Sequence, residues 1–147
     1  GCREEFDYGQ ALDIFKHGDA LLQPRIASAD YDLDGDVDFV VTQNGGPAYL
    51  LENNLEGVNW IRIKLIGTAS NRVGYGSTLR LWTGEQELIR HLGSGRSYLS
   101  ASDPRITFGL GDRESVSRLE IRWPSGTVQV LEDPPINTTI EVVEPSK

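Results

Sequence analysis

The sequence lacks the cysteine pairs that stabilise many small secreted domains, and it lacks a long apolar run. Its 147 residues contain one cysteine, Cys2, so no disulfide can form within the chain. No apolar run approaches the roughly 20 residues that a membrane-spanning helix requires. A chain of this length buries roughly 68–70% of its unfolded surface, so it can fold around a hydrophobic core without disulfides. These absences predict one globular domain, or one domain and a smaller partner element.

Residues 1–24 contain few patterns that indicate a helix, a strand or a targeting signal. No secretory signal sequence is recognisable, so we expect a mature or trimmed part of a longer protein. Cys2 has two interpretations, a terminal residue without a structural role or a lipid-attachment cysteine at the start of a mature bacterial chain. The run Ala11–Phe15 fits a short helix or a strand, and residues 1–24 form a segment of unassigned structure.

A basic face is also missing. Residues 1–53 contain 11 acids and 3 bases, which accounts for the whole net charge of −8, and residues 54–147 contain 11 of each. Proteins that bind duplex nucleic acid carry clustered lysine and arginine. The charge distribution therefore excludes nucleic acid as the main partner.

From residue 25 onward, short runs of β-forming residues alternate with turn signals. Alternation of apolar and polar residues is clearest in Trp60–Ile66 and Thr78–Trp82, and the latter pairs with Gln86–His91 across a tight turn. Seven or so short strands after residue 56 predict an antiparallel β-sandwich or a barrel-like domain. Further strands are expected at Arg25–Ala29, Phe39–Thr42, Ala48–Glu52, Arg105–Phe108, Ser117–Trp123, Thr127–Leu131 and Thr138–Val143.

Residues 30–38, Asp-Tyr-Asp-Leu-Asp-Gly-Asp-Val-Asp, place carboxylates at alternate positions of a tight loop. Calcium takes six to eight oxygen ligands, and Gly35 permits the sharp turn that brings them together. An EF-hand requires a glutamate at loop position 12, where this chain has Val41. The loop is therefore of the β-flanked type, with a structural calcium ion. The predicted ligands are Asp30, Asp32, Asp34, Asp38 and the backbone carbonyl of Asp36.

The loop and the strands after it, Asp30–Asp38 followed by Phe39–Asn53, resemble an FG-GAP (VCBS-type) repeat. Such repeats bind calcium through the matching aspartates in integrin-like β-propellers. Family members usually carry several repeats, and this sequence contains one recognisable repeat. A single blade cannot close a propeller ring, so the resemblance implies either a C-terminal piece of a longer protein or a lone repeat that packs on the sandwich.

The remaining chain resembles the ASPIC/UnbV domain, which follows FG-GAP repeats in bacterial exported proteins, enediyne-cluster proteins and animal cartilage acidic proteins. The resemblance implies residues 25–55 as the calcium-binding repeat, residues 56–147 as the β-sandwich domain, and an extracytoplasmic location. The matching stretches are Asn59–Trp60, Leu65–Thr68, Ser70–Gly76, Gly93–Gly95, Tyr98–Ser100, Ser102–Arg105, Phe108–Gly111 and Leu119–Gly126.

The other chemistry-bearing residues predict no catalytic site. His17 and His91 lack the neighbours of a nucleophilic triad, and neither Gly-x-Ser-x-Gly nor His-Glu-x-x-His occurs. Trp60, Trp82 and Trp123 are expected in the core rather than on a sugar-stacking platform. The sequence thus predicts a non-catalytic, calcium-stabilised binding or adhesion module for a protein or glycan ligand. The alternative is an accessory protein, or a hydrolase that uses surface carboxylates in a biosynthetic or polysaccharide-processing pathway.

Overall fold

The computed structural model describes residues 4–5, 25–42, 46–54, 57–95 and 101–146. These residues form β-strands and turns and contain no helix, which confirms the all-β prediction. The described part of the chain accordingly offers no helix that could cross a membrane. The interpretations of Cys2, Ala11–Phe15 and His17 concern residues outside these ranges.

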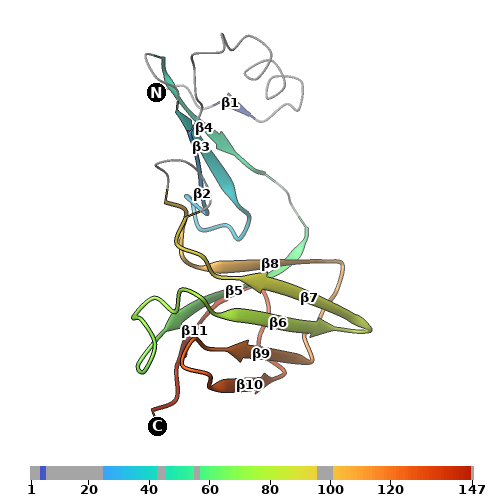
Figure 1. Cartoon of the computed structure of the whole chain (residues 1–147). Coiled ribbons are helices and arrows are strands. Elements are labelled where there is room, and N and C mark those ends of the chain that lie inside the picture. Colours follow the sequence, from blue (N-terminus) through green and yellow to red (C-terminus); the bar gives the residue numbers. More distant parts are fainter. Residues whose placement is uncertain (1–3, 6–24, 43–45, 55–56, 96–100, 147) are drawn as a thin grey trace. The chain divides into compact units, whose positions relative to one another are not determined.

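The chain divides into two compact units. The first consists of residues 1–56 together with 95–103, and the second of residues 57–94 together with 104–147. The sheet of the first unit has the strand order β1-β4-β3-β2 (Figure 1). Strands β2, β3 and β4 pair antiparallel, and β1 pairs parallel with β4. The strand bounds are β1 Glu4–Glu5, β2 Arg25–Ala29, β3 Asp38–Thr42 and β4 Ala48–Glu52.

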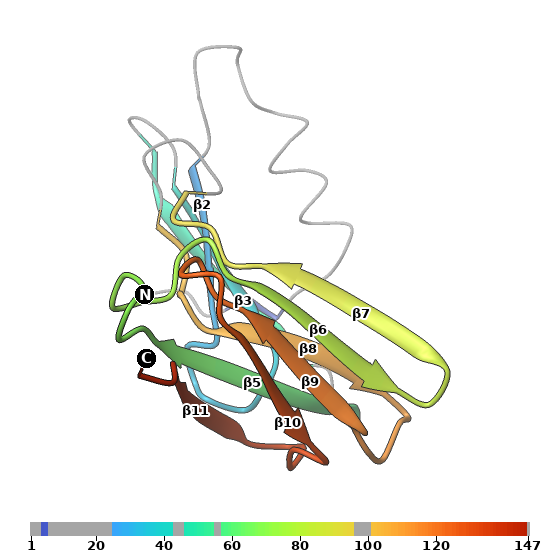
Figure 2. The same ribbon diagram turned by 60° about the horizontal axis from the view of Figure 1, so that its bottom comes forward.

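The second unit contains two sheets, with strand orders β10-β9-β6-β7 and β11-β5-β8 (Figures 1 and 2). All pairs are antiparallel except that of β11 with β5, which is parallel. This arrangement is a β-sandwich, and neither sheet closes into a barrel. The strand bounds are β5 Asn59–Ile66, β6 Thr78–Thr83, β7 Gln86–His91, β8 Ile106–Gly111, β9 Arg118–Arg122, β10 Val128–Glu132 and β11 Thr139–Val143.

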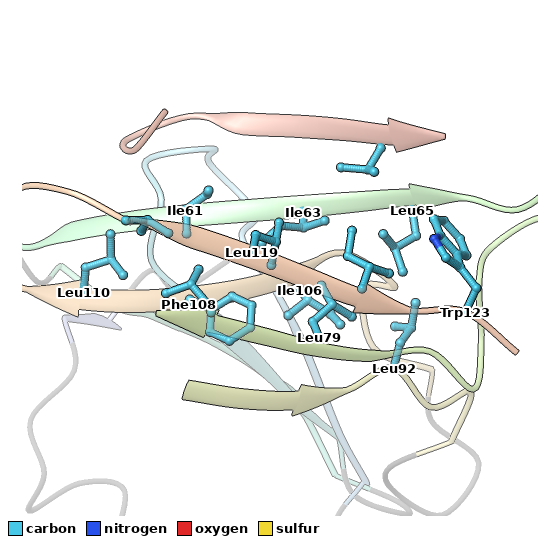
Figure 3. Packing of buried hydrophobic residues seen from close by; sticks show 14 residues of the cluster. Ile61, Ile63, Leu65, Leu79, Leu92, Ile106, Phe108, Leu110, Leu119 and Trp123 are labelled. Atoms are coloured by element: carbon cyan, nitrogen blue, oxygen red, sulfur yellow. The ribbon is translucent and has the colours of Figure 1, made fainter. Parts of the chain in front are cut away.

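The core of the second unit lies between its two sheets. Because successive side chains of a strand point to opposite faces, one face of β5, β6, β8 and β9 carries buried apolar residues at alternate positions. Figure 3 shows these side chains gathered in the space between the strands. The fully buried ones are Ile61, Ile63, Leu79, Leu81, Phe108, Leu110, Leu119 and Ile121, and Trp123 is 2% exposed.

The prediction that the three tryptophans lie in the core is right for Trp123 and wrong for the other two. Trp60 and Trp82 are half-buried and lie on the opposite phase of their strands from the core residues. Each is covered by an arginine, with Arg62 5.1 Å from the Trp60 ring centroid and Arg118 5.1 Å from that of Trp82. A guanidinium that stacks on an indole ring shields the ring from water, so the tryptophan does not have to lie in the core.

Gly74 is required by close packing beneath the loop between β5 and β6. Its φ is +76°, and a Cβ placed there would lie 3.0 Å from Leu65 Cβ and 3.3 Å from Trp123 Cζ3. Gly84, in the β6–β7 turn, has a φ of +57° and nothing within 4 Å of such a Cβ. A side chain at Gly84 would therefore add backbone strain alone, whereas one at Gly74 would add both backbone strain and steric overlap.

We expect Gly74→Ala to lower the free energy of unfolding of the second unit by roughly 2–4 kcal/mol, the sum of left-handed strain and overpacking. Gly84→Ala, which adds only the strain, should cost about 1 kcal/mol. Urea unfolding followed by tryptophan fluorescence measures both values. Equal losses in the two variants would contradict the packing role of Gly74.

Candidate metal centre

The acidic loop connects two paired strands of the first unit. Strand β2 ends at Ala29, which pairs with Asp38 at the start of β3, so residues 30–37 close a hairpin. Two residues of the loop adopt positive φ, Leu33 at 68° and Gly35 at 110°. Glycine adopts this conformation readily, as predicted for Gly35, whereas leucine rarely does. The surrounding loop therefore holds Leu33 in a strained conformation.

Two buried aspartates organise the loop through backbone amides. Asp38, which is 2% exposed, accepts hydrogen bonds from the amide of Tyr31 to Oδ2 at 2.7 Å and from that of Asn53 to Oδ1 at 2.9 Å. Asp30, which is 4% exposed, accepts one from the amide of Gly35 at 3.2 Å. These contacts draw the two ends of the loop and the end of β4 toward one point.

Three of the five predicted ligands come together there. One carboxylate oxygen from each of Asp30, Asp32 and Asp38 lies within 4.8 Å of the other two. Asp34 and Asp36 are not part of this group, and Asp34 Oδ1 accepts a hydrogen bond from the amide of Asp36 at 3.0 Å. Within the described ranges, this is the one group of three or more potential metal-ligating side chains.

The electrostatics of the group favour a cation. Two carboxylates about 5 Å apart repel by about 1 kcal/mol in bulk water and by several times more near a protein surface. The donors are all oxygen, the ligand type that calcium prefers, and backbone carbonyls and water can complete its coordination. The residues present therefore suit calcium better than zinc, which takes nitrogen and sulfur ligands.

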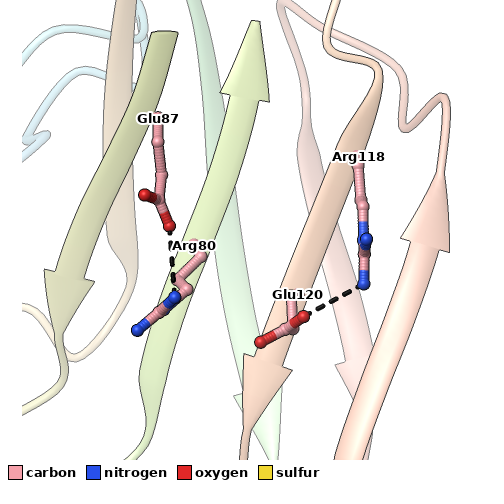
Figure 4. A network of polar contacts seen from close by, with 4 residues as sticks. All are labelled: Arg80, Glu87, Arg118 and Glu120. Carbon is pink, nitrogen blue, oxygen red and sulfur yellow. Dashed lines mark hydrogen bonds and ion pairs between the residues drawn. The ribbon is translucent and has the colours of Figure 1, made fainter.

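The exposed side of the β10-β9-β6-β7 sheet carries two ion pairs. Arg80 Nη1 lies 3.4 Å from Glu87 Oε1, and Arg118 Nη2 lies 3.0 Å from Glu120 Oε2 (Figure 4). Exposed pairs of this kind stabilise a fold by only about 0.2–1 kcal/mol each. They place acid opposite base, whereas a glycosidase site needs two acids that flank the substrate. His91 is exposed and contacts Thr78 Oγ1 at 3.0 Å through Nδ1.

Glu144 is a buried carboxylate that the sequence interpretation missed. It is 1% exposed, and its Oε2 accepts hydrogen bonds from the amides of Thr68, Ala69 and Ser70 at 2.9, 2.9 and 2.7 Å. Its Oε1 accepts from the hydroxyls of Ser70 at 2.8 Å and Ser125 at 2.5 Å. The available signal was its spacing, because it follows the buried Val142 by two residues and so falls on the inward phase of β11.

These hydrogen bonds determine the ionisation of Glu144. Burial raises its pKa, but the hydrogen bonds from Ser125, Ser70 and Thr68 outweigh burial and lower the pKa from 4.5 to about 2. The carboxylate is therefore ionised at neutral pH, and it ties the end of β11 to the loop after β5.

Comparison with known proteins assigns the C-terminal part of the chain to a family. No curated protein matches the sequence. The family described as ASPIC and UnbV matches residues 67–147, which cover most of the sandwich, the loop at Thr68–Ser70 and Glu144. That match spans more than half of the sequence, and the chain belongs to the ASPIC and UnbV family.

Proposed function

We propose that this chain is a calcium-stabilised, non-catalytic binding module of an extracytoplasmic protein. The observation that carries the proposal is the convergence of Asp30, Asp32 and Asp38 oxygens to within 4.8 Å of one another in a strand-flanked loop. Calcium in the loop would fix the hairpin of the first unit, and the sandwich would present a surface to a protein or glycan ligand. With three carboxylates, one of them exposed, we expect weak affinity, in the range of extracellular calcium modules.

We further propose that residues 25–55 form one FG-GAP-type repeat. Successive residues of β3 point to opposite faces of the sheet, and Phe39 and Val40 are each 41% exposed. Pairing places Val41 beside Ile26 and Tyr49 on one face, and Val40 beside Ala27 and Leu50 on the other. A sheet with apolar residues on both faces is expected to be covered on both. Other repeats of a parent chain would supply that cover.

Terbium luminescence tests the metal site directly. Tb³⁺ replaces calcium at oxygen ligands and emits when a nearby aromatic ring transfers energy to it, and Tyr31 follows the candidate ligand Asp30. We expect emission sensitised by tyrosine at stoichiometric Tb³⁺, competed away by calcium. Asp32→Asn should weaken it strongly, and because Asp32 is exposed we expect the loop to stay folded in this variant.

The matched control is Asp112→Asn, which removes an exposed aspartate of the second unit and should leave the emission unchanged. Emission that calcium does not displace, or that Asp32→Asn leaves intact, would exclude a calcium site in the loop. A glycan array and a pull-down, each run with calcium and with EDTA, would then separate a binding module from a purely structural cap.

A further inference from the structure

The loop between β5 and β6, residues 67–77, has its conformation determined by internal hydrogen bonds. The amide of Gly67 donates to the Arg72 carbonyl at 3.1 Å, and the amide of Gly74 to that of Asn71 at 2.8 Å. The Asn71 side chain donates to the Tyr75 carbonyl at 2.7 Å and accepts from the Tyr75 amide at 2.8 Å. A Cβ at Gly67 would lie 2.1 Å from the Asn71 carbonyl oxygen, so only glycine fits there.

Glu144, which follows strand β11, holds the same loop through further hydrogen bonds. The Glu144 carboxylate holds the amides of Thr68, Ala69 and Ser70, and the Thr68 hydroxyl donates to the Glu144 carbonyl at 3.1 Å. The side chains of Thr68, Ser70 and Asn71 are thus all committed to the loop's own structure.

Arg72 is the exception among the polar side chains of residues 68–72. It is exposed, and within the described residues its guanidinium takes part in no hydrogen bond or ion pair. Its backbone carbonyl is held by Gly67, so the residue is fixed in place while its charge stays uncommitted. Arginine offers five donors in a planar fork that matches a carboxylate.

Arg72 also lines a hollow of about 250 Å³. Its walls are mostly apolar, and Lys64 already pairs with Glu141 at 2.6 Å, so Arg72 supplies the uncompensated positive charge. The volume is below the range of drug-sized ligand sites and has room for roughly eight water-sized groups. The lining residues are Lys64, Leu65, Ile66, Arg72, Val73 and Pro104.

We propose that this hollow binds a small organic carboxylate, with the carboxylate on Arg72 and the apolar body against Ile66 and Val73. A bidentate pair between arginine and a carboxylate combines charge with two parallel hydrogen bonds. The rigid loop reduces the cost of ordering Arg72 on binding. The site lies within the second unit and does not involve the aspartate loop. This proposal can therefore be tested independently of the calcium proposal.

Hexanoate, which has eight non-hydrogen atoms, is a suitable probe. Ligand-observed NMR titration of the full chain should show saturable binding, with a Kd on the order of 1 mM. Hexanol lacks the charge and acetate lacks the apolar body, so both should bind at least about tenfold more weakly. Arg72→Gln should raise the Kd of hexanoate by about tenfold or more, the loss expected for one charge-assisted interaction.

Arg122→Gln is the matched control, because it removes the same charge from an exposed residue of β9. It should leave the Kd within about twofold of the unsubstituted chain. EDTA should leave hexanoate binding unchanged, which keeps this test separate from that of the metal site. The proposal is overturned if hexanoate does not saturate, if hexanol binds as well, or if the two arginine variants behave alike.

Discussion

Replacing Glu144 by glutamine is expected to lower the melting temperature of the second unit by on the order of 10 °C at pH 7. The buried carboxylate accepts five hydrogen bonds, three from backbone amides and two from serine hydroxyls. Glutamine keeps the size of the side chain but loses its charge, and one of its two oxygens becomes a donor. Glu144→Ala should cost more, since it leaves all five donors without that acceptor.

The same carboxylate predicts an acid-dependent loss of stability. The pKa of Glu144 is lowered to about 2 in the fold from a usual value of 4.5. The unfolded chain therefore binds the proton more readily, and the stabilisation is complete above about pH 4.5 and lost as the pH falls toward 2. Glu144→Gln lacks this carboxylate, so its melting temperature should fall less steeply over that interval.

Glu141→Gln provides the control for both measurements. Glu141 lies on the same strand but is 53% exposed, and it pairs with Lys64 at 2.6 Å. Its substitution should shift the melting temperature by no more than about 2–3 °C. Trp60, Trp82 and Trp123 all belong to the second unit, so tryptophan fluorescence reports on that unit alone. Similar shifts for the two glutamate variants would show that Glu144 has no special structural role.

Chelation of calcium by EDTA is expected to lower the melting temperature of the first unit by roughly 10 °C from its value at saturating calcium. An ion that binds only the folded state at 100 times its Kd stabilises it by about 2.7 kcal/mol, and each kcal/mol shifts a unit of this size by about 4–8 °C. Differential scanning calorimetry would record this transition. Tryptophan fluorescence, followed in parallel, should show no change in the second unit.

Two aspartate variants separate metal binding from the hydrogen bonds of the loop. Asp32 is exposed, so Asp32→Asn should match the unsubstituted chain in EDTA and lose most of the calcium-dependent shift. Asp38→Asn should lower the melting temperature even in EDTA, because both Asp38 oxygens accept backbone amides. If calcium and EDTA give the same calorimetric transition, the carboxylates coexist without a metal and the proposed function fails.

The strands could be predicted from the sequence because their signals are local. The alternation in Trp60–Ile66 and Thr78–Trp82 marks both the strand and its buried face, and the observed bounds of β5 and β6 differ from the predicted ones by at most one residue. The tryptophans show where this reasoning ends. Alternation alone does not distinguish a core face from an outer face on which an arginine covers the ring, as at Trp60 and Trp82.

The acidic loop was also readable from sequence, because its geometry is set within nine residues. Alternate side chains of a tight turn tend to point toward one centre, and the structure brings together three of them, Asp30, Asp32 and Asp38. The roles of Asp34 and Asp36 depend on how the turn closes. That closure involves the amide of Asn53, 15 residues further along the chain, which the loop's own pattern does not contain.

The all-β class, most strand positions and the acidic loop follow from local sequence patterns, since each depends on residues a few positions apart. Tertiary structure alone decided the parallel pairing of β11 with β5, the seating of Glu144 on amides 74–76 residues earlier, and the hollow beside Arg72. Folding of the whole chain, not local propensity, brings such distant groups together. The inward phase of β11 marks Glu144 as buried, but neither segment's pattern indicates which amides donate to its carboxylate.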